Sequence, residues 1–208
     1  MLRATFAAAT VFLGMCCALE ARGDDPIVRI EEDWELEVKI PDNEVTAPQI
    51  ITAISPEGTL AGVHATFEIN HIASVAFGSG GLHLSTWCGD THLAVAHAGN
   101  YASMYTDGEV VKWTQIMELK DEKLIFKVRN GTSSTWGNFG SWGTLRLELD
   151  SNLQDLSGYS PSVSVAKSEV SFAGNRVQTL KIRSVRYIRA SGATTTDSTE
   201  RIVHELTE

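Results

Sequence analysis

The stretch WELEVKI, residues 34–40, shows the pattern that decides the fold of this chain. Apolar side chains at every second position alternate there with charged ones. Successive side chains of a β-strand point to opposite faces, so a period of two is typical of a strand with one buried side. The same alternation recurs at residues 63–70, 124–128 and 145–149. The sequence therefore predicts a chain built mainly of half-buried strands.

Less regular apolar runs predict the remaining strands. They lie at residues 48–54, 81–87, 91–97, 109–119, 162–166, 169–173 and 177–189. Turn-forming pairs such as Asn130-Gly131 separate them. A hairpin is expected where Lys120-Asp121 joins 112–119 to 122–128. No run of ten or more residues after the N-terminal segment repeats with the helical period of 3.6, so no helix is predicted there.

Many short strands without an internal repeat favour an all-β domain. We expect a two-sheet antiparallel sandwich, a jelly roll of the concanavalin-like kind, over residues 28–190. A smaller immunoglobulin-like sandwich with decorations is the alternative. Residues 191–208 are predicted to form a flexible C-terminal tail, with a weak final strand around 201–206 as the alternative.

The two ends of the predicted domain carry complementary charge. Residues 31–37 read EEDWELE, and the last long strand carries a row of cations, namely Arg176, Lys181, Arg183, Arg186 and Arg189. Opposite charges facing each other across two strands are stabilising. We therefore expect the first strand to pair with this last long strand. The alternative is a basic patch for a sulfated or uronic polysaccharide.

The first 23 residues have the order of a secretory signal peptide. Arg3 precedes an apolar run over residues 4–18, and small residues follow at Ala18 and at 21–23, where cleavage is expected. The run is shorter than the ~20 residues of a membrane span. The sequence thus predicts an exported protein, periplasmic or extracellular, without a membrane span. Lipidation at Cys16 or Cys17 is an alternative that their preceding residues fit poorly.

Charge and cysteine content narrow the class of protein further. The 208 residues carry a formal net charge of −9, which gives the chain no electrostatic reason to bind nucleic acid. Cys88 alone follows the predicted signal peptide, so no intrachain disulfide is expected. A buried thiol is the favoured interpretation of Cys88. A reactive thiol and an intermolecular bridge are the alternatives.

Residues 129–143, RNGTSSTWGNFGSWG, form the segment with the clearest binding chemistry. Trp136 and Trp142 can stack on the apolar face of a sugar ring, while Asn138 hydrogen-bonds its hydroxyls. Trp87 joins this predicted site if its side chain points outward. The alternative is that the tryptophans close the open end of the sandwich, with the glycines letting the loop fold over them.

Metal and catalytic sites are not predicted. His83, His92 and His97 are close in sequence, but strand parity puts His92 on the face opposite His97, so they are interpreted as solvent-facing polar residues. No cofactor is expected; Ca²⁺ is the alternative, through loop oxygens at Asp90, Asn100, Asp107 and Glu109. Because familiar catalytic motifs are absent from the sequence, no catalytic residue is assigned, and an enzyme is not favoured.

Several motifs together resemble a group of secreted bacterial single-domain β-sandwich proteins, numerous in planctomycetes. They are DWELEV at 33–38, APQI at 47–50, ATFEIN at 65–70, GGLHL at 80–84, NGTSSTWGNFG at 130–140 and GNRV at 174–177. The resemblance implies export and a single domain, and it carries over no site residue. A looser resemblance to concanavalin-like lectin and glucanase sandwiches implies glycan binding. The glucanases carry a Glu-x-Asp-x-x-Glu strand, whereas residues 31–37 have a different order.

The sequence therefore favours a secreted, non-enzymatic protein that binds a carbohydrate or a cell-envelope polymer through residues 130–143. A structural or interaction protein of the cell envelope is the alternative. A cryptic glycoside hydrolase, which needs two carboxylates facing across a cleft, is the second alternative. The oligomeric state is left open.

Overall fold

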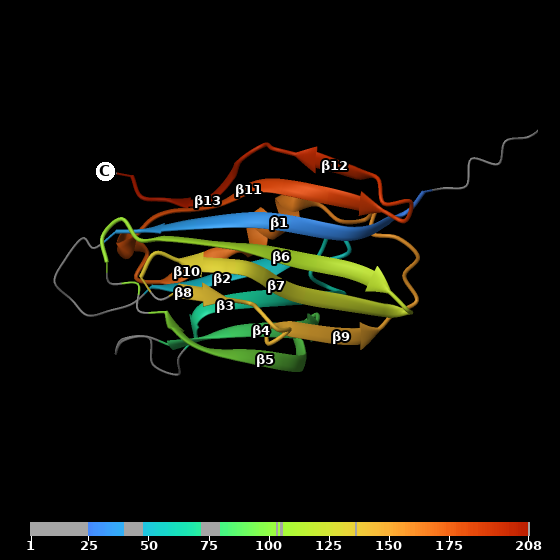
Figure 1. The fold of residues 1–208 in the computed structure, drawn as a ribbon, viewed down its shortest axis with the longest axis horizontal. Helices are drawn as coiled ribbons and strands as arrows, with labels where there is room; N and C mark the ends of the chain where they lie inside the picture. The colour runs from blue at the N-terminus through green and yellow to red at the C-terminus, as the bar shows by residue number, and fades with distance from the viewer. Residues whose placement is uncertain are drawn as a thin grey trace, which may run out of the picture.

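The computed structural model describes residues 25–39, 48–71, 80–102, 104, 106–135 and 137–207. The predicted signal peptide lies outside these residues. The described chain forms two antiparallel sheets that pack face to face, which confirms the predicted all-β sandwich. Figure 1 shows the long strands of both sheets running along the long axis of the molecule.

The larger sheet, sheet A, is built around the long strands from the two ends of the domain. Its order is β12 (Thr194–Asp197), β11 (Val177–Arg189), β1 (Ile27–Val38), β6 (Val110–Lys120), β7 (Lys123–Ser133) and β8 (Gly137–Phe139). Two more strands extend it, β13 (Arg201–Glu205) beside β11 and β9 (Arg146–Asp150) beside β7. The smaller sheet, sheet B, has the order β10 (Glu169–Phe172), β2 (Gln49–Ile54), β3 (Val63–His71), β4 (Gly80–Cys88) and β5 (Thr91–Ala102).

The predicted pairing of the first strand with the last long strand is confirmed. β1 and β11 are antiparallel, with Glu31 opposite Arg186 and Glu35 opposite Lys181. Arg186 and Glu31 form an ion pair at 2.6 Å. The predicted hairpin is also present, because Lys120 of β6 faces Lys123 of β7 across a two-residue turn with positive φ at both positions. Such a turn matches the right-handed twist of the strands it joins.

Aromatic side chains fill the space between the sheets. Trp34 of β1 stacks on Trp113 of β6 with ring centres 5.9 Å apart and planes 2° apart. Phe67 of β3 meets Trp113 edge-on at 5.7 Å. Phe139, at the end of β8, stacks on Phe67 at 6.1 Å and is almost fully buried. Phe139 therefore closes this part of the core, a role that the sequence suggested for the tryptophans of residues 129–143.

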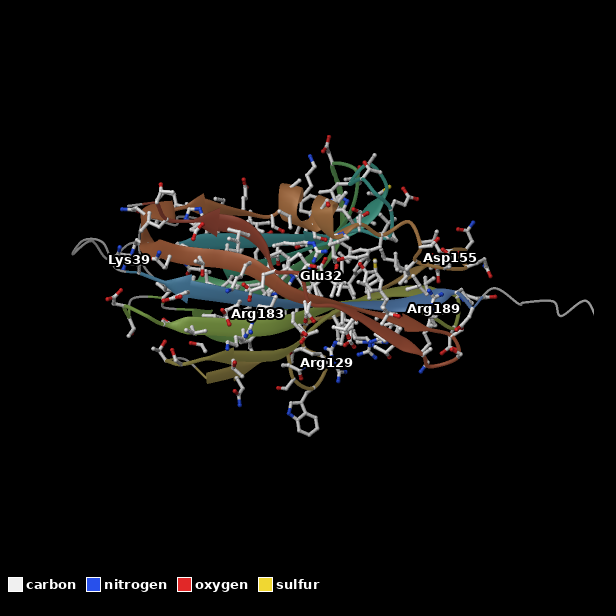
Figure 2. All side chains as sticks on the ribbon, turned by 90° about the horizontal axis from the view of Figure 1, so that it is seen from above. Glu32, Lys39, Arg129, Asp155, Arg183 and Arg189 are labelled. Atoms are coloured by element: carbon white, nitrogen blue, oxygen red, sulfur yellow. The ribbon has the colours of Figure 1, made fainter. Side chains whose placement is uncertain are left out.

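A carboxyl group, Glu32, is also buried in the core. Its side chain points inward from β1, and Figure 2 labels it near the middle of the molecule. Tyr159 and Ser164 donate hydrogen bonds to Oε1 at 2.8 and 2.5 Å, and the Trp34 indole donates to Oε2 at 3.0 Å. Burial raises the pKa of Glu32 to about 7, although the three hydrogen bonds act in the opposite direction.

One predicted strand is a helix. Residues 162–166, expected to be extended, lie in α1 (Pro161–Lys167), which packs against β2. Pro161 fits the first helical turn, where its missing N–H costs no hydrogen bond. The valines at 163 and 165 produced a misleading alternation. A short 3₁₀ helix, Gly174–Arg176, precedes β11.

The C-terminal segment differs from the expected flexible tail. Residues 191–208 contain β12 and β13, and both pair with β11. The alternative strand around 201–206 corresponds closely to β13. Cys88 differs as well, because its side chain is exposed rather than buried. Among the described residues, no helix is long and apolar enough to cross a membrane.

Candidate functional site

A hydrogen-bonded row of polar side chains crosses four adjacent strands on the outer face of sheet A. We call it the polar row: Asn130 of β7, Thr114 of β6, Asp33 of β1 and Ser184 of β11. The Asn130 amide donates to Thr114 Oγ1 at 3.3 Å, and that hydroxyl donates to Asp33 Oδ1 at 2.8 Å. The Ser184 hydroxyl donates to Asp33 Oδ2 at 3.0 Å. Each group is therefore oriented by its neighbour.

Two register irregularities explain why these side chains meet. The β1–β11 ladder shifts between Asp33 and Trp34, and the β6–β7 ladder shifts between Lys112 and Thr114. Asn130 has a φ of 55°, the left-handed conformation that asparagine tolerates better than most residues. Bulges re-aim side chains and are common beside functional sites. The two register shifts therefore bring the side chains of the polar row within hydrogen-bonding distance across neighbouring strands.

Two hollows in the surface meet at Asn130, and together we call them the Asn130 groove. The first has a volume of about 490 Å³ and includes the polar row. The second, of about 500 Å³, extends over the loop after β7 and β8. Asn138 and Trp142 line the second hollow, and Arg183 lines the first. Figure 2 labels Arg183 and Arg129, one from each hollow.

Trp142 stands at the outer end of the groove in an unusual conformation. Its side chain is 99% exposed, and its φ is 58°. It occupies the tip of a tight turn closed by a hydrogen bond from Thr144 N–H to Ser141 C=O at 3.2 Å. A bulky residue at positive φ is strained, and such strain gathers at functional sites. Here no burial of the indole offsets the strain.

The structure separates the four predicted ligand-binding residues. Asn138 and Trp142 share the second hollow. Trp136 lies outside the described residues. Trp87 is on β4, on the outer face of sheet B, where its indole donates to Thr66 Oγ1 at 3.0 Å. Trp87 therefore points outward but faces away from the Asn130 groove, and it does not join the other predicted residues.

A larger hollow lies elsewhere and has less suitable chemistry. It measures about 800 Å³ and is lined by the β6–β7 turn, the β9 end and residues near Pro56. No aromatic side chain lines it, and its charged groups include Glu57, Asp121 and Glu122. A sugar-binding site usually needs a flat apolar surface beside polar groups. The Asn130 groove has both.

Glu35, a carboxylate near the groove, forms ion pairs that stabilise its ionised form and make it a poor proton donor. Glu35 contacts Lys112 and Arg183, both at 3.2 Å, and Lys181 at 3.6 Å. Partial burial alone would raise the pKa of Glu35, but these cations hold it below its usual range. A glycosidase acid needs a raised pKa. Glu32 has a raised pKa but is fully buried.

The four residues considered for Ca²⁺ do not form one site around Asp90. Asp90 lies in the β4–β5 turn, about 33 Å along β5 from Asn100, given the rise of a strand. Glu109 is buried, and its Oε1 accepts hydrogen bonds from Ser133 and, at 2.6 Å, from Thr135. Asp107 is exposed in the turn before β6.

The outer face of sheet B collects five of the six histidines, on β3, β4 and β5. A register shift at Trp87 brings His92 against the Trp87 indole, with ring centres 4.8 Å apart. His92 therefore lies on the same face as His97, contrary to the parity argument. Burial, with the neighbouring His71 and His97, lowers the pKa of His83 to about 4.

Sequence reasoning missed the polar row. Asp33 was part of an acidic run, and Thr114 and Ser184 carried no motif. The available signal was Asn130-Gly131 inside an otherwise alternating strand, which indicates a bulge as well as a turn. Comparison with models of known protein families finds no match, and comparison with curated protein sequences finds none either.

Proposed function

We propose that this protein binds a saccharide chain in the Asn130 groove, with Trp142 as the stacking surface. The fully exposed Trp142 indole, carried on a backbone with positive φ, is the observation that carries the proposal. An indole face packs well against the C–H face of a pyranose ring, and a sugar would cover apolar area now exposed to water. The export predicted from residues 1–23 agrees with a glycan partner.

The polar groups of the groove suit the hydroxyls of the same ligand. Asn138 and Arg129 lie in the hollow of Trp142, and Asn130 joins it to the polar row. Asp33 already accepts three hydrogen bonds, from Thr114, Ser184 and, at 3.4 Å, Arg186. A carboxylate fixed in this way is pre-organised to accept sugar hydroxyls, because little conformational freedom is lost on binding.

The length of the groove favours a chain over a single sugar. Its two hollows run across β7, β6, β1 and β11, from the Trp142 turn to Ser198 and Glu200 in the β12–β13 connection. Glu200 is held there by Lys181 at 3.2 Å. Strands lie ~4.8 Å apart, so the groove spans several sugar residues. We therefore expect polysaccharides to bind more tightly than their monosaccharides.

Intrinsic fluorescence tests the proposal, because Trp142 is open to the soluble quencher iodide. A panel of soluble polysaccharides is titrated into the protein. Binding is expected to shift emission to the blue and to protect Trp142 from iodide. Trp142→Ala should abolish both effects with an unchanged thermal unfolding midpoint. Asn130→Gly keeps the left-handed backbone but removes the amide, and should weaken binding about tenfold, the loss of one good hydrogen bond.

Trp87→Ala is the matched control, since it removes an outward-facing tryptophan from the other sheet. Its polysaccharide response should equal that of the unaltered protein. A response that survives Trp142→Ala, or is lost in Trp87→Ala, contradicts the proposal. So does the lack of a saturable response to every polysaccharide in the panel, which would favour the cell-envelope interaction role instead.

A further inference from the structure

A row of three residues whose side chains can bind metal ions crosses sheet B, on the face opposite the Asn130 groove. Glu68 of β3 lies directly opposite His83 of β4, and His83 lies directly opposite His97 of β5. All three side chains point to the outer face, because Phe67, Leu82 and Leu84 beside them are buried in the core. Opposed residues of antiparallel strands have Cβ atoms ~5 Å apart. Their side chains therefore meet.

The two histidines of this row already point their nitrogens at each other. His97 Nδ1 and His83 Nε2 are 2.7 Å apart, and the ring planes cross at 84°. One imidazole must donate its N–H to the other at this distance. Two imidazole nitrogens that bind one tetrahedral ion lie about 3.3 Å apart, given metal–nitrogen distances near 2.05 Å. To bind one ion, the two rings therefore have to separate slightly and turn, so that both nitrogen lone pairs point at the ion instead of along the line between the nitrogens.

His71 reaches the same place through a backbone irregularity. The β3–β4 register shifts between Ile69 and His71, at Asn70, whose φ is 67°. The His71 ring consequently stacks on His83 with ring centres 3.8 Å apart. Its Nδ1 is paired with the Glu68 carboxylate, which leaves Nε2 as its other ring nitrogen. A carboxylate on the far nitrogen of a histidine orients many metal ligands in this way.

We infer that Glu68, His71, His83 and His97 form a binding site for one divalent ion of the Zn²⁺ class. His83 Nε2 and His97 Nδ1 are the paired ligands, His71 Nε2 is the third, and Glu68 orients His71. Imidazole suits Zn²⁺, Cu²⁺ and Ni²⁺, whereas Ca²⁺ and Mg²⁺ require oxygen. This site goes beyond saccharide binding and does not depend on it.

Binding requires the histidine side chains to turn. Among the described residues, no group of three or more His, Cys, Asp or Glu side chains could hold a metal ion in the positions that the structure gives them. An imidazole binds a metal in its ring plane, so His71 has to leave its stack on His83. The His71 side chain is 39% exposed and the His97 side chain is exposed. Both therefore have room to move, and an ion can approach from solvent.

Calorimetric titration of the untagged full chain with Zn²⁺ tests the inference. One Zn²⁺ per chain is expected to bind. His83→Ala and His97→Ala should each weaken binding at least about tenfold, and Glu68→Gln, which removes an orienting partner, by about tenfold. His92→Ala is the matched control on the same sheet face, and His204→Ala is the control on sheet A; both should bind normally.

A measurement on the unaltered protein guards against variants that misfold. Imidazole ¹⁵N spectra should show Zn²⁺-dependent shifts at His71, His83 and His97 but not at His204. Co²⁺ in place of Zn²⁺ should give the intense visible absorption of tetrahedral coordination. The inference is overturned if His83→Ala and His97→Ala bind Zn²⁺ as tightly as the unaltered protein. It is also overturned if Zn²⁺ leaves the spectra of the His71, His83 and His97 rings unshifted.

Discussion

The Tyr159 hydroxyl donates a hydrogen bond to Glu32 at 2.8 Å inside the sandwich, joining residues 127 positions apart. Ser164 of α1 donates to the same oxygen at 2.5 Å. These two hydrogen bonds link the long connection between β9 and β10 to β1. Burying a carboxyl group costs free energy unless the group is hydrogen-bonded or protonated. Glu32 is hydrogen-bonded, and its raised pKa favours the protonated form.

Glu32 should make stability fall as pH rises. Its pKa is about 7 in the folded protein against an ordinary value near 4.5, so between these values the folded state holds a proton that the unfolded chain has lost. Its contribution is fully present below pH 4.5 and is lost as pH rises through 7, a change of about 3 kcal/mol in the free energy of unfolding.

Urea denaturation of the unaltered protein and of Glu32→Gln from pH 4.5 to 8 measures this effect. Glutamine stays neutral, so the variant lacks this titration. The difference in unfolding free energy between the two proteins should change across the range by the amount above. Parallel pH profiles would show that the pKa of Glu32 is the same in the folded and unfolded states, which contradicts the prediction.

Gly131→Ala should destabilise the fold because Phe139 occupies the space of the new methyl group. A Cβ at Gly131 would lie 2.3 Å from the Phe139 ring. Phe139 is packed against Phe67 and cannot withdraw freely. The expected loss is about 2–3 kcal/mol of unfolding free energy, typical of overpacking. Gly58→Ala is the control, since its nearest contact would be 3.9 Å away, and should stay within about 0.5 kcal/mol.

Removal of residues 191–208 should also cost stability, in contrast to the loss of a flexible tail. β12 and β13 both pair with β11, and Val203 packs against the core. The expected loss is about 2 kcal/mol or more, the value of burying one aliphatic side chain. Removal of residues 207 and 208 alone leaves β13 intact and is the control. Equal unfolding midpoints for the two truncated proteins would support a tail without structure.

Alternation was sufficient to predict most strands, because each has one face in the core. It could also have predicted the burial of Glu32, which shares its parity with Trp34 and Leu36. Alternation could not predict the bulges at Asp33 and Asn70, because strand register depends on partner strands that are far away in sequence. The site therefore could be predicted only in part: Trp142 and Asn138 had local signals, whereas the polar row depended on four strands meeting.

The packing of Phe139 has a consequence for protein engineering. The base of the 129–143 segment tolerates little change. A Cβ at Gly131 would collide with the Phe139 ring, and a Cβ at Gly140 would collide with the Val128 carbonyl. In the outer turn, residues 141–144, the side chains at positions 141, 142 and 144 are exposed. Positions 141, 142 and 144 can thus be randomised in a library while the base stays constant. New recognition can then be selected there on a scaffold whose core contains none of the residues being varied.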